Sequence, residues 1–181
     1  MTKGLGNALL VGVFVVAGAN ASPALASTDG SFGATSQGSV AISATVPGRV
    51  KLTKLSDVTF TNVDPTLAAS NAQNVCVWSN TASRRYTINA TGSGASNAFT
   101  LAAGTNTVPY TVEWAQTSGQ TSGTALTAGV ALLNQSSGAV MQDCGGGASA
   151  SLIVGIASSE LQGMTASTPY TGTLTLLVSA Q

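Results

Sequence analysis

Residues 39–46, SVAISATV, alternate large apolar side chains with small or polar ones. Val40, Ile42 and Val46 recur with the two-residue period of a half-buried β-strand. The stretch follows a leader, residues 27–38 (STDGSFGATSQG), whose Gly- and Ser-rich composition is typical of a mobile segment. A strand on a tether can complete the sheet of its own domain or that of a neighbouring molecule, and the sequence leaves both alternatives open.

The chain before this leader has the pattern of a secretory signal peptide over residues 1–26. Lys3 gives a positive start, the apolar run ALLVGVFVVAGA follows, and Ala24 and Ala26 fit a small-x-small cleavage site. The run is shorter than the about 20 residues that span a bilayer. Cleavage after Ala21 is an alternative. We therefore expect an exported mature chain that begins at Ser27 and has no membrane insertion after cleavage.

Short apolar stretches, separated by turn-forming residues, recur about every ten residues behind Pro47 and Gly48. Alternation predicts strands within 49–55, 57–63, 84–92, 97–104, 107–114, 130–140 and 170–181, and continuous apolar runs predict buried strands at 74–78 and 148–158. No stretch of helical length has helical periodicity, although residues 158–169 could hold one helical turn. The pattern predicts an all-β chain with one immunoglobulin-like β-sandwich over residues 47–181.

Two cysteines, Cys76 and Cys144, follow the expected signal peptide. One disulfide is the simplest state of such a pair in an exported protein, with two free thiols as the alternative. The bridge would stabilise the fold by roughly 4 kcal/mol in the chain-entropy model. Trp78 shares a strand face with Cys76, so we expect it to pack in the core on an inter-sheet disulfide. For both Trp78 and Trp114, a sugar-stacking surface is the alternative to a place in the core.

Composition argues against several kinds of chemistry. The chain has no histidine, which removes Ser–His and Cys–His nucleophile pairs and leaves no ligand set for a metal. The carboxylates are scattered rather than paired as a glycosidase requires. The mature chain has five cations against six carboxylates, so no basic surplus exists for nucleic acid. We expect no enzyme activity, no catalytic residue, no metal and no cofactor.

The doublet Arg84-Arg85 is the one basic pair in the chain. We expect it to cap a hairpin in solvent, and contact with an anionic surface is the alternative.

The two ends of the mature chain are complementary. The final stretch alternates Leu174, Leu176 and Val178 with polar residues, and we expect it to be a last strand whose outer edge is uncovered. An uncovered apolar edge aggregates unless something pairs with it. The surplus strand at residues 39–46 could fill that edge in another molecule, which is donor-strand complementation. Three large inward side chains would contribute roughly 5–9 kcal/mol.

These features resemble the pilus subunits of the bacterial chaperone–usher pathway. SVAISATV followed by Pro47 is similar to the donor segment of α-type colonization-factor pilins. The cysteine pair and the Thr/Ser/Gly-rich composition are similar to the archaic, spore-coat-U-like pilins. The ending, with Gly172 before the alternating leucines, is similar to the last strand of pilins generally.

The resemblance implies a structural shaft subunit of a cell-surface fimbria that supports adhesion and biofilm formation. It implies a homopolymer of identical or related pilins, exported through the periplasm with the help of a chaperone and an outer-membrane usher. Residues 27–46 would be the N-terminal extension, with donor side chains Val40, Ile42, Ala44 and Val46. The acceptor groove would be lined by Val50, Leu52, Leu55, Leu174, Leu176 and Val178. Two alternatives remain: SVAISATV pairs within its own domain, with the leader around Phe32 as donor, or the protein is a secreted lectin-like binding module or tip adhesin.

Overall fold

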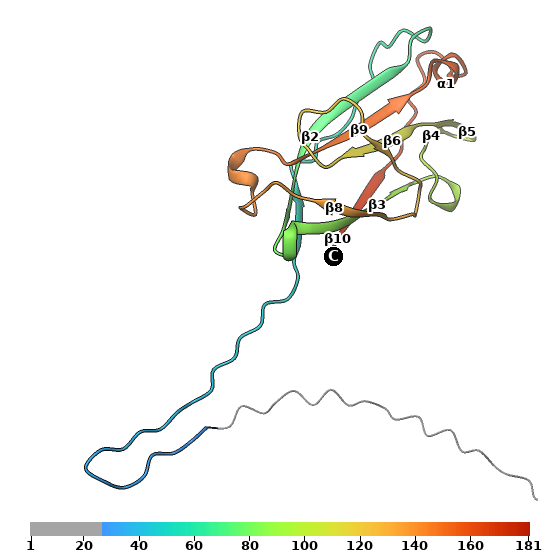
Figure 1. Ribbon diagram of the computed structural model, residues 1–181. Coiled ribbons are helices and arrows are strands. Elements are labelled where there is room, and N and C mark those ends of the chain that lie inside the picture. The colour runs from blue at the N-terminus through green and yellow to red at the C-terminus, as the bar shows by residue number, and fades with distance from the viewer. Residues whose placement is uncertain (1–26) are drawn as a thin grey trace, which may run out of the picture. The chain divides into compact units, whose positions relative to one another are not determined.

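A computed structural model describes residues 27–181, and the expected signal peptide at residues 1–26 lies outside them. The chain divides into two units, Met1–Thr45 and Val46–Gln181. The second unit is nearly all β, with antiparallel sheets and one short α-helix (Figure 1). The all-β prediction is therefore confirmed.

The larger sheet has the strand order β1-β2-β9-β6-β7. Its strands are β1 (Val50–Thr53), β2 (Ala69–Ser79), β9 (Ala150–Ile156), β6 (Thr111–Ala115) and β7 (Thr124–Ala125). Strand β2 is internal, between β1 and β9, as its apolar run predicts. It pairs with β9 through Ala69–Val75 and with β1 only through Cys76–Ser79. On the β1 side, the first half of β2 thus has no ladder partner among the described residues.

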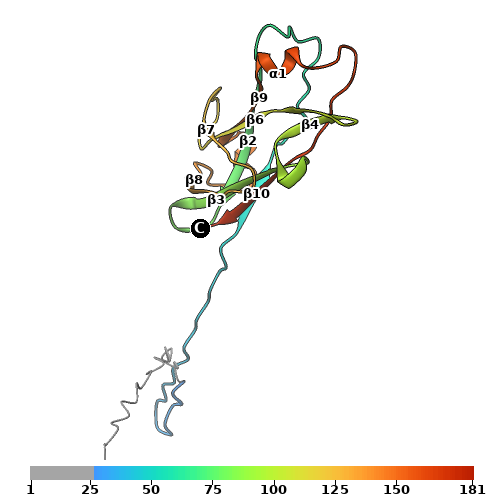
Figure 2. The same ribbon diagram turned by 90° about the vertical axis from the view of Figure 1, so that its right-hand side faces the viewer.

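The smaller sheet has the order β10-β3-β8 and lies across the core from the larger one (Figure 2). Its strands are β3 (Arg85–Gly92), β8 (Leu132–Ser136) and β10 (Leu174–Ala180). A separate hairpin joins β4 (Thr100–Ala103) to β5 (Asn106–Pro109). The expected helical turn is α1 (Ser158–Gln162), which follows β9.

The core lies between the two sheets and is centred on an aromatic pair. Tyr86 of β3 and Trp114 of β6 pack edge to face with ring centroids 6.5 Å apart. The Trp114 Nε1–H donates a hydrogen bond of 3.1 Å to the Tyr86 hydroxyl. Trp114 is only 1% exposed, so the sugar-stacking interpretation of this residue is wrong. Burial raises the pKa of Tyr86 to about 12, against a smaller lowering by the Trp114 hydrogen bond.

The predicted strand at 107–114 is split. Val108, Tyr110, Val112 and Trp114 are all buried, as alternation predicts. They belong to two strands, however, because β5 ends at Pro109 and β6 begins at Thr111. Proline has no amide hydrogen and cannot continue a ladder, so the chain changes partner there.

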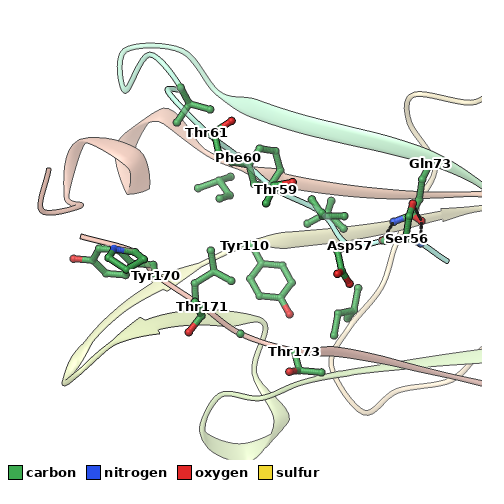
Figure 3. Close-up of a pocket in the computed structure, with 18 of the residues that line it drawn as sticks. Ser56, Asp57, Thr59, Phe60, Thr61, Gln73, Tyr110, Tyr170, Thr171 and Thr173 are labelled. Atoms are coloured by element: carbon green, nitrogen blue, oxygen red, sulfur yellow. Dashed lines mark hydrogen bonds between the residues drawn. The ribbon is translucent and has the colours of Figure 1, made fainter. Parts of the chain in front are cut away.

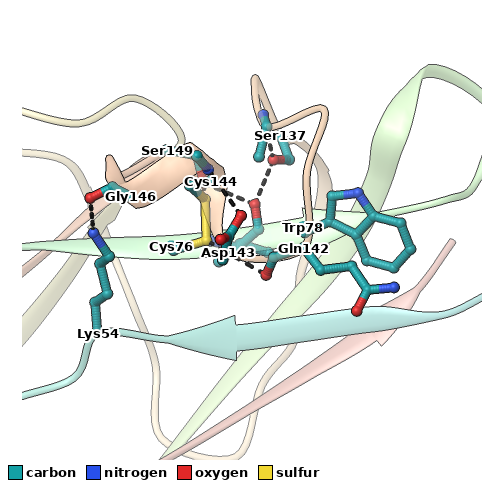
Figure 4. Close-up of a disulfide and its surroundings, with 12 residues drawn as sticks. Lys54, Cys76, Trp78, Ser137, Gln142, Asp143, Cys144, Gly146 and Ser149 are labelled. Carbon is teal, nitrogen blue, oxygen red and sulfur yellow. Dashed lines mark hydrogen bonds between the residues drawn. A yellow bond between two sulfur atoms is a disulfide. The ribbon is translucent and has the colours of Figure 1, made fainter.

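The disulfide Cys76–Cys144 is present, but it does not join the two sheets (Figure 4). Cys144 lies in a short 3-10 turn, Cys144–Gly146, in the loop between β8 and β9. Val75 and Val77 of β2 belong to the core, so Cys76 lies on the opposite face of the strand, beneath that loop. The inter-sheet prediction is therefore wrong.

Trp78 also lies on this outer face. Its side chain is half-buried, and its Nε1–H donates to the Val140 carbonyl at 3.3 Å. Figure 4 shows the Trp78 ring to one side of the disulfide. The tryptophan thus ties the loop to β2 and is not a core residue, which corrects the sequence prediction. Alternation places Trp78 with Cys76 as expected, but it does not tell which face of β2 meets the other sheet.

The arginine doublet lies where the chain crosses between sheets, not at a hairpin. A 3-10 turn, Ala82–Arg84, joins β2 of the larger sheet to β3 of the smaller one. The Ser79 and Thr81 hydroxyls both donate to the Arg85 carbonyl, at 3.0 and 2.6 Å. These two bonds hold the connection between the sheets in place. Arg84 and Arg85 therefore lie in a connection between two sheets and not at a hairpin turn, so the hairpin prediction is wrong.

Two alternating stretches are not strands. Residues 57–63 contain none, although Val58 and Phe60 are half-buried against the core. The predicted strand at 57–63 is therefore wrong, because side-chain alternation places apolar groups on one face but cannot supply a backbone partner. Residues 40–49 contain no strand either. In this stretch Val40, Ile42 and Val46 are 75%, 87% and 78% exposed.

Replacing both bridge cysteines, C76A/C144A, should lower the free energy of unfolding by roughly 4 kcal/mol, because the open chain regains the entropy of a long loop. Urea unfolding followed by tryptophan fluorescence measures this difference. Chemical reduction of the unchanged protein should give the same loss. A loss below about 1 kcal/mol in both would show that the bridge constrains the unfolded chain little.

The stability of the protein should fall as pH rises through the alkaline range. The pKa of Tyr86 is about 12 in the folded protein and 10.0 in the unfolded chain. The folded state therefore holds the proton more tightly, and the stability it gives is present below pH 10 and is lost between these two values. Urea unfolding across this range should show a shallower pH dependence for Tyr86→Phe. An equal slope in both proteins would contradict the assignment.

Candidate functional site: an apolar groove beside β10

A groove of about 760 Å³ runs between two stretches of chain that flank the core (Figure 3). One wall is the stretch after β1, here called the A wall (residues 55–61 and Val63). The other is the stretch that leads into β10, here called the F wall (residues 168–174 and Leu176). The two walls are far apart in sequence and come from opposite ends of the domain sequence.

The floor of the groove is the apolar core itself. Alternation on β9 directs Leu152, Val154 and Ile156 toward it, and each is less than a tenth exposed. Tyr110 stacks on Phe99 with centroids 5.7 Å apart, and burial raises the pKa of its hydroxyl. Such a floor favours apolar side chains of an occupant. The other floor residues, which come from β4, the residue before β6, and α1 with the turn after it, are Leu101, Tyr110, Leu161 and Met164.

One side chain holds the A wall in place. Strand β1 ends at Thr53, and Lys54 has a left-handed backbone, φ 65°, that turns the chain away from the ladder. The Ser56 amide and hydroxyl then donate to Gln73 Oε1 at 2.9 and 3.1 Å. Gln73 Nε2–H donates in return to the Ser56 carbonyl at 3.1 Å. The Gln73 side chain thus makes, for Ser56 alone, the backbone hydrogen bonds that a neighbouring strand would otherwise make.

The F wall is held against the β4–β5 hairpin. Thr171 and Ala102 exchange two backbone hydrogen bonds of 2.8 and 3.0 Å, and the Thr173 amide donates to the Ser93 hydroxyl at 2.9 Å. Gly172 is required between them, because a Cβ at this position would lie 2.8 Å from the Thr100 carbonyl oxygen. The wall is therefore fixed before β10 begins.

The strands that continue the two walls, β1 and β10, converge at one end of the domain, and the walls themselves lie toward the other end. The start of β1 and the end of β10 lie together, since a Cβ on Gly48 would be 3.3 Å from the Ala180 Cβ. β10 pairs with β3 along one edge, from Leu174 to Ala180. No described strand pairs with its other edge. The groove thus combines an apolar floor with a free strand edge.

The sequence-predicted groove residues divide into two groups. Leu55, Leu174 and Leu176 line the groove. Val50, Leu52 and Val178 do not, because they lie where β1 and β10 converge; they are half-buried and pack on the core.

Sequence reasoning missed the floor and most of the A wall. Val58, Phe60 and Val63 line the groove, and their spacing in DVTFTNV is the signal that could have found them. The pattern by itself predicts an ordinary strand, because the alternation of apolar side chains is the same in an extended stretch without backbone partners and in a paired strand.

The predicted donor residues are accessible. Val40, Ile42 and Val46 are among the most exposed large apolar side chains of the described chain, and Ala44 is exposed as well. Phe32, the alternative donor, is fully exposed. It lies in the loop between Thr28 and Ser39, whose backbones exchange hydrogen bonds of 2.9 and 2.8 Å.

Other kinds of site find little support in residues 27–181. No group of three or more His, Cys, Asp and Glu side chains in this range could hold a metal ion. No helix in the same range has the length and apolarity needed to cross a bilayer. Of the two tryptophans considered for sugar stacking, Trp114 is buried and Trp78 is half-buried.

No protein-family model matches the chain, and no curated protein matches it either. The function is therefore inferred from the groove, its free strand edge and the segment before β1.

The hydrogen bonds of Gln73 give a test of the A wall. Gln73→Ala removes all three, so the Ser56 amide, which donates to Gln73 Oε1, should exchange with deuterium roughly tenfold faster, as about 1.4 kcal/mol of lost local stability requires. The matched control is Gln73→Glu, which keeps an acceptor for the Ser56 amide and hydroxyl and should lose less protection. Equal exchange in all three proteins would mean that the wall is held by other contacts.

Proposed function

We propose that this protein is the structural subunit of a bacterial surface pilus and that it polymerises by donor-strand exchange. Residues 27–46 of one subunit would place Val40, Ile42, Ala44 and Val46 in the groove of the next. The observation that carries the proposal is the apolar groove along the free edge of β10, in a chain that also presents an exposed, alternating apolar segment.

The chemistry of the two parts is complementary. The large donor side chains would cover Leu152, Val154 and the other apolar floor residues, while the donor backbone would pair with β10. Burial of three such side chains contributes roughly 5–9 kcal/mol, and each ladder hydrogen bond adds about 1 kcal/mol. Together these terms are comparable with the stability of a whole small domain.

Contacts at the base of the groove favour an occupant from another molecule. Asn80 holds the chain just before β1, since it donates to the Pro47 carbonyl at 3.0 Å and accepts from the Arg49 amide at 2.6 Å. Val46 therefore lies near the end of the domain where Gly48 and Ala180 bring β1 and β10 together. A self-inserted segment would have to enter there and run parallel to β10, against the antiparallel pairing of every other strand.

Such an assembly needs accessory proteins. A subunit with an uncovered apolar groove and a free strand edge would aggregate. A periplasmic chaperone that lends a strand, and an outer-membrane usher where that strand is exchanged, would protect it until it joins the fibre. The contact is head-to-tail and does not close on itself, so repetition gives a filament at the cell surface. There it would support adhesion and biofilm formation.

Charge placed on the two faces of the donor segment tests the proposal. Ile42→Asp puts a carboxylate into the apolar groove and should abolish the ladder of oligomers that survives detergent without boiling. The matched control is Ser43→Asp, which carries the same charge on the opposite face and should leave the ladder intact. Gel electrophoresis of unheated samples measures both.

A ladder that persists in Ile42→Asp would exclude residues 39–46 as the donor. The double variant Phe32→Asp/Ile42→Asp then asks whether the leader takes its place. A wild-type protein that is monomeric at every concentration would instead favour a secreted binding module.

A further inference from the structure

Three arginines lie at one end of the domain, and two of its carboxylates lie at the other. Arg49 precedes β1, and Arg84 and Arg85 lie at the crossing from β2 to β3. Backbone bonds bring these segments together: Asn80 N–H donates to the Arg49 carbonyl at 3.1 Å, and Gln181 N–H donates to the Arg85 carbonyl at 3.3 Å. We call this group of three arginines the basic end.

Two carboxylates lie at the opposite end. Asp64 is in the loop before β2, and Glu160 is in α1, just after β9. Ala69 at the start of β2 pairs with Ile156 at the end of β9, so both segments leave the sheet at the same edge. We call this pair the acidic end. Figure 1 shows α1 and this loop at the opposite end of the domain from the C-terminus.

The two ends are well separated. β2 runs from one to the other over 11 residues, which corresponds to about 35 Å. Charges this far apart are screened from each other at physiological salt, where the Debye length is about 8 Å. They cannot therefore stabilise one another within one subunit.

The hydrogen-bond partners of these charges are neutral. Arg84 Nε–H donates to the Ser137 carbonyl at 3.2 Å, and Arg85 Nη1–H donates to Asn134 Oδ1 at 3.1 Å. Asp64 accepts from the hydroxyl and amide of Thr66 at 2.7 and 2.8 Å, which lowers the pKa of the Asp64 carboxyl and keeps it ionised. Each end thus retains its charge for a contact outside the domain.

The direction of the donor strand decides which ends meet. β10 runs from the groove, at Leu174, toward the basic end, at Ala180. A donor antiparallel to β10 would run the other way, and its last residue, Val46, would emerge at the acidic end of the acceptor. Arg49 follows three residues later, so the basic end of the donor subunit would lie about 10 Å beyond. A parallel donor would bring two basic ends together instead.

We propose that, in the fibre, the basic end of each subunit contacts the acidic end of the next, as a second interface beside the inserted donor strand. The partner is a second copy of this chain, and the inference rests on the proposed donor-strand exchange. Opposite charges speed association and fix its orientation, whereas like charges oppose the parallel arrangement.

Polymerisation of the purified protein at low and high salt tests this contact. The variant D64N/E160Q removes both charges, and each amide keeps the size of the carboxylate that it replaces. It should polymerise roughly fivefold more slowly at low salt, as two surface ion pairs of about 0.5 kcal/mol imply, and the difference should vanish at high salt. The matched control, Glu113→Gln, removes a carboxylate of β6 that lies at neither end and should change nothing.

Reversal of both ends separates this contact from a general effect of charge. D64K/E160K alone should slow assembly further, and the combination with R49E/R85E should restore it, because the ends are again complementary. A synthetic peptide of residues 38–46 lacks the arginines, so it should inhibit growth of wild type and D64N/E160Q equally.

Two results would overturn the inference, and they are distinguishable. Peptide inhibition with no charge or salt dependence, or with no restoration in the reversed protein, leaves donor-strand exchange standing and removes the end-to-end contact. A wild type that does not polymerise, or whose growth the peptide does not inhibit, removes both proposals.

Discussion

The free edge of β10, beside an apolar floor, is the constraint on which the rest of the account depends. A strand edge that pairs on one side only presents backbone donors and acceptors to whatever approaches. Here the edge lies next to a groove whose floor is the core of the domain, with Leu152, Val154 and Ile156 at its base. An occupant would therefore gain a backbone ladder and apolar burial at once. Backbone hydrogen bonds and apolar burial are also the two interactions that stabilise the interior of a β-sandwich.

The remainder of the domain is organised so that this groove persists. The Tyr86–Trp114 pair joins the two sheets in the middle of the core. Cys76 and Cys144 tie the long β8–β9 loop to the outer face of β2. On the A wall, Gln73 supplies hydrogen bonds that a strand would otherwise provide. The walls are thus held by hydrogen bonds to neighbouring segments, which leaves the apolar floor of the groove available.

Much of the fold is predictable because strand periodicity reports which side chains face a core. The alternation of Val108, Tyr110, Val112 and Trp114 indicates one buried face, and the apolar run around Cys76 indicates a central strand. Periodicity fails where the backbone partner decides. Val58 and Phe60 alternate as strand residues do, yet their stretch has no ladder and becomes a wall of the groove.

The candidate site is predictable in part for the same reason. Leu174 and Leu176 line the groove because β10 alternates, but the convergence of β1 and β10 at Gly48 and Ala180 removes Val178 from it. Where two walls meet depends on long-range packing, which no local pattern reports. The sequence pattern misplaces the disulfide for a similar reason. Alternation puts Cys76 and Trp78 on the same face of β2, but it does not say whether that face meets the other sheet.

Cross-linking between isotopically heavy and light chains tests the central claim most directly. A photoreactive residue at position 42, in fibres assembled from both kinds of chain, would report what this position contacts. Donor-strand exchange predicts cross-linked peptides that join a light chain to a heavy one, with the attachment in residues 55–63 or 168–176. Cross-links confined to single chains, or attached elsewhere on the domain, would contradict it.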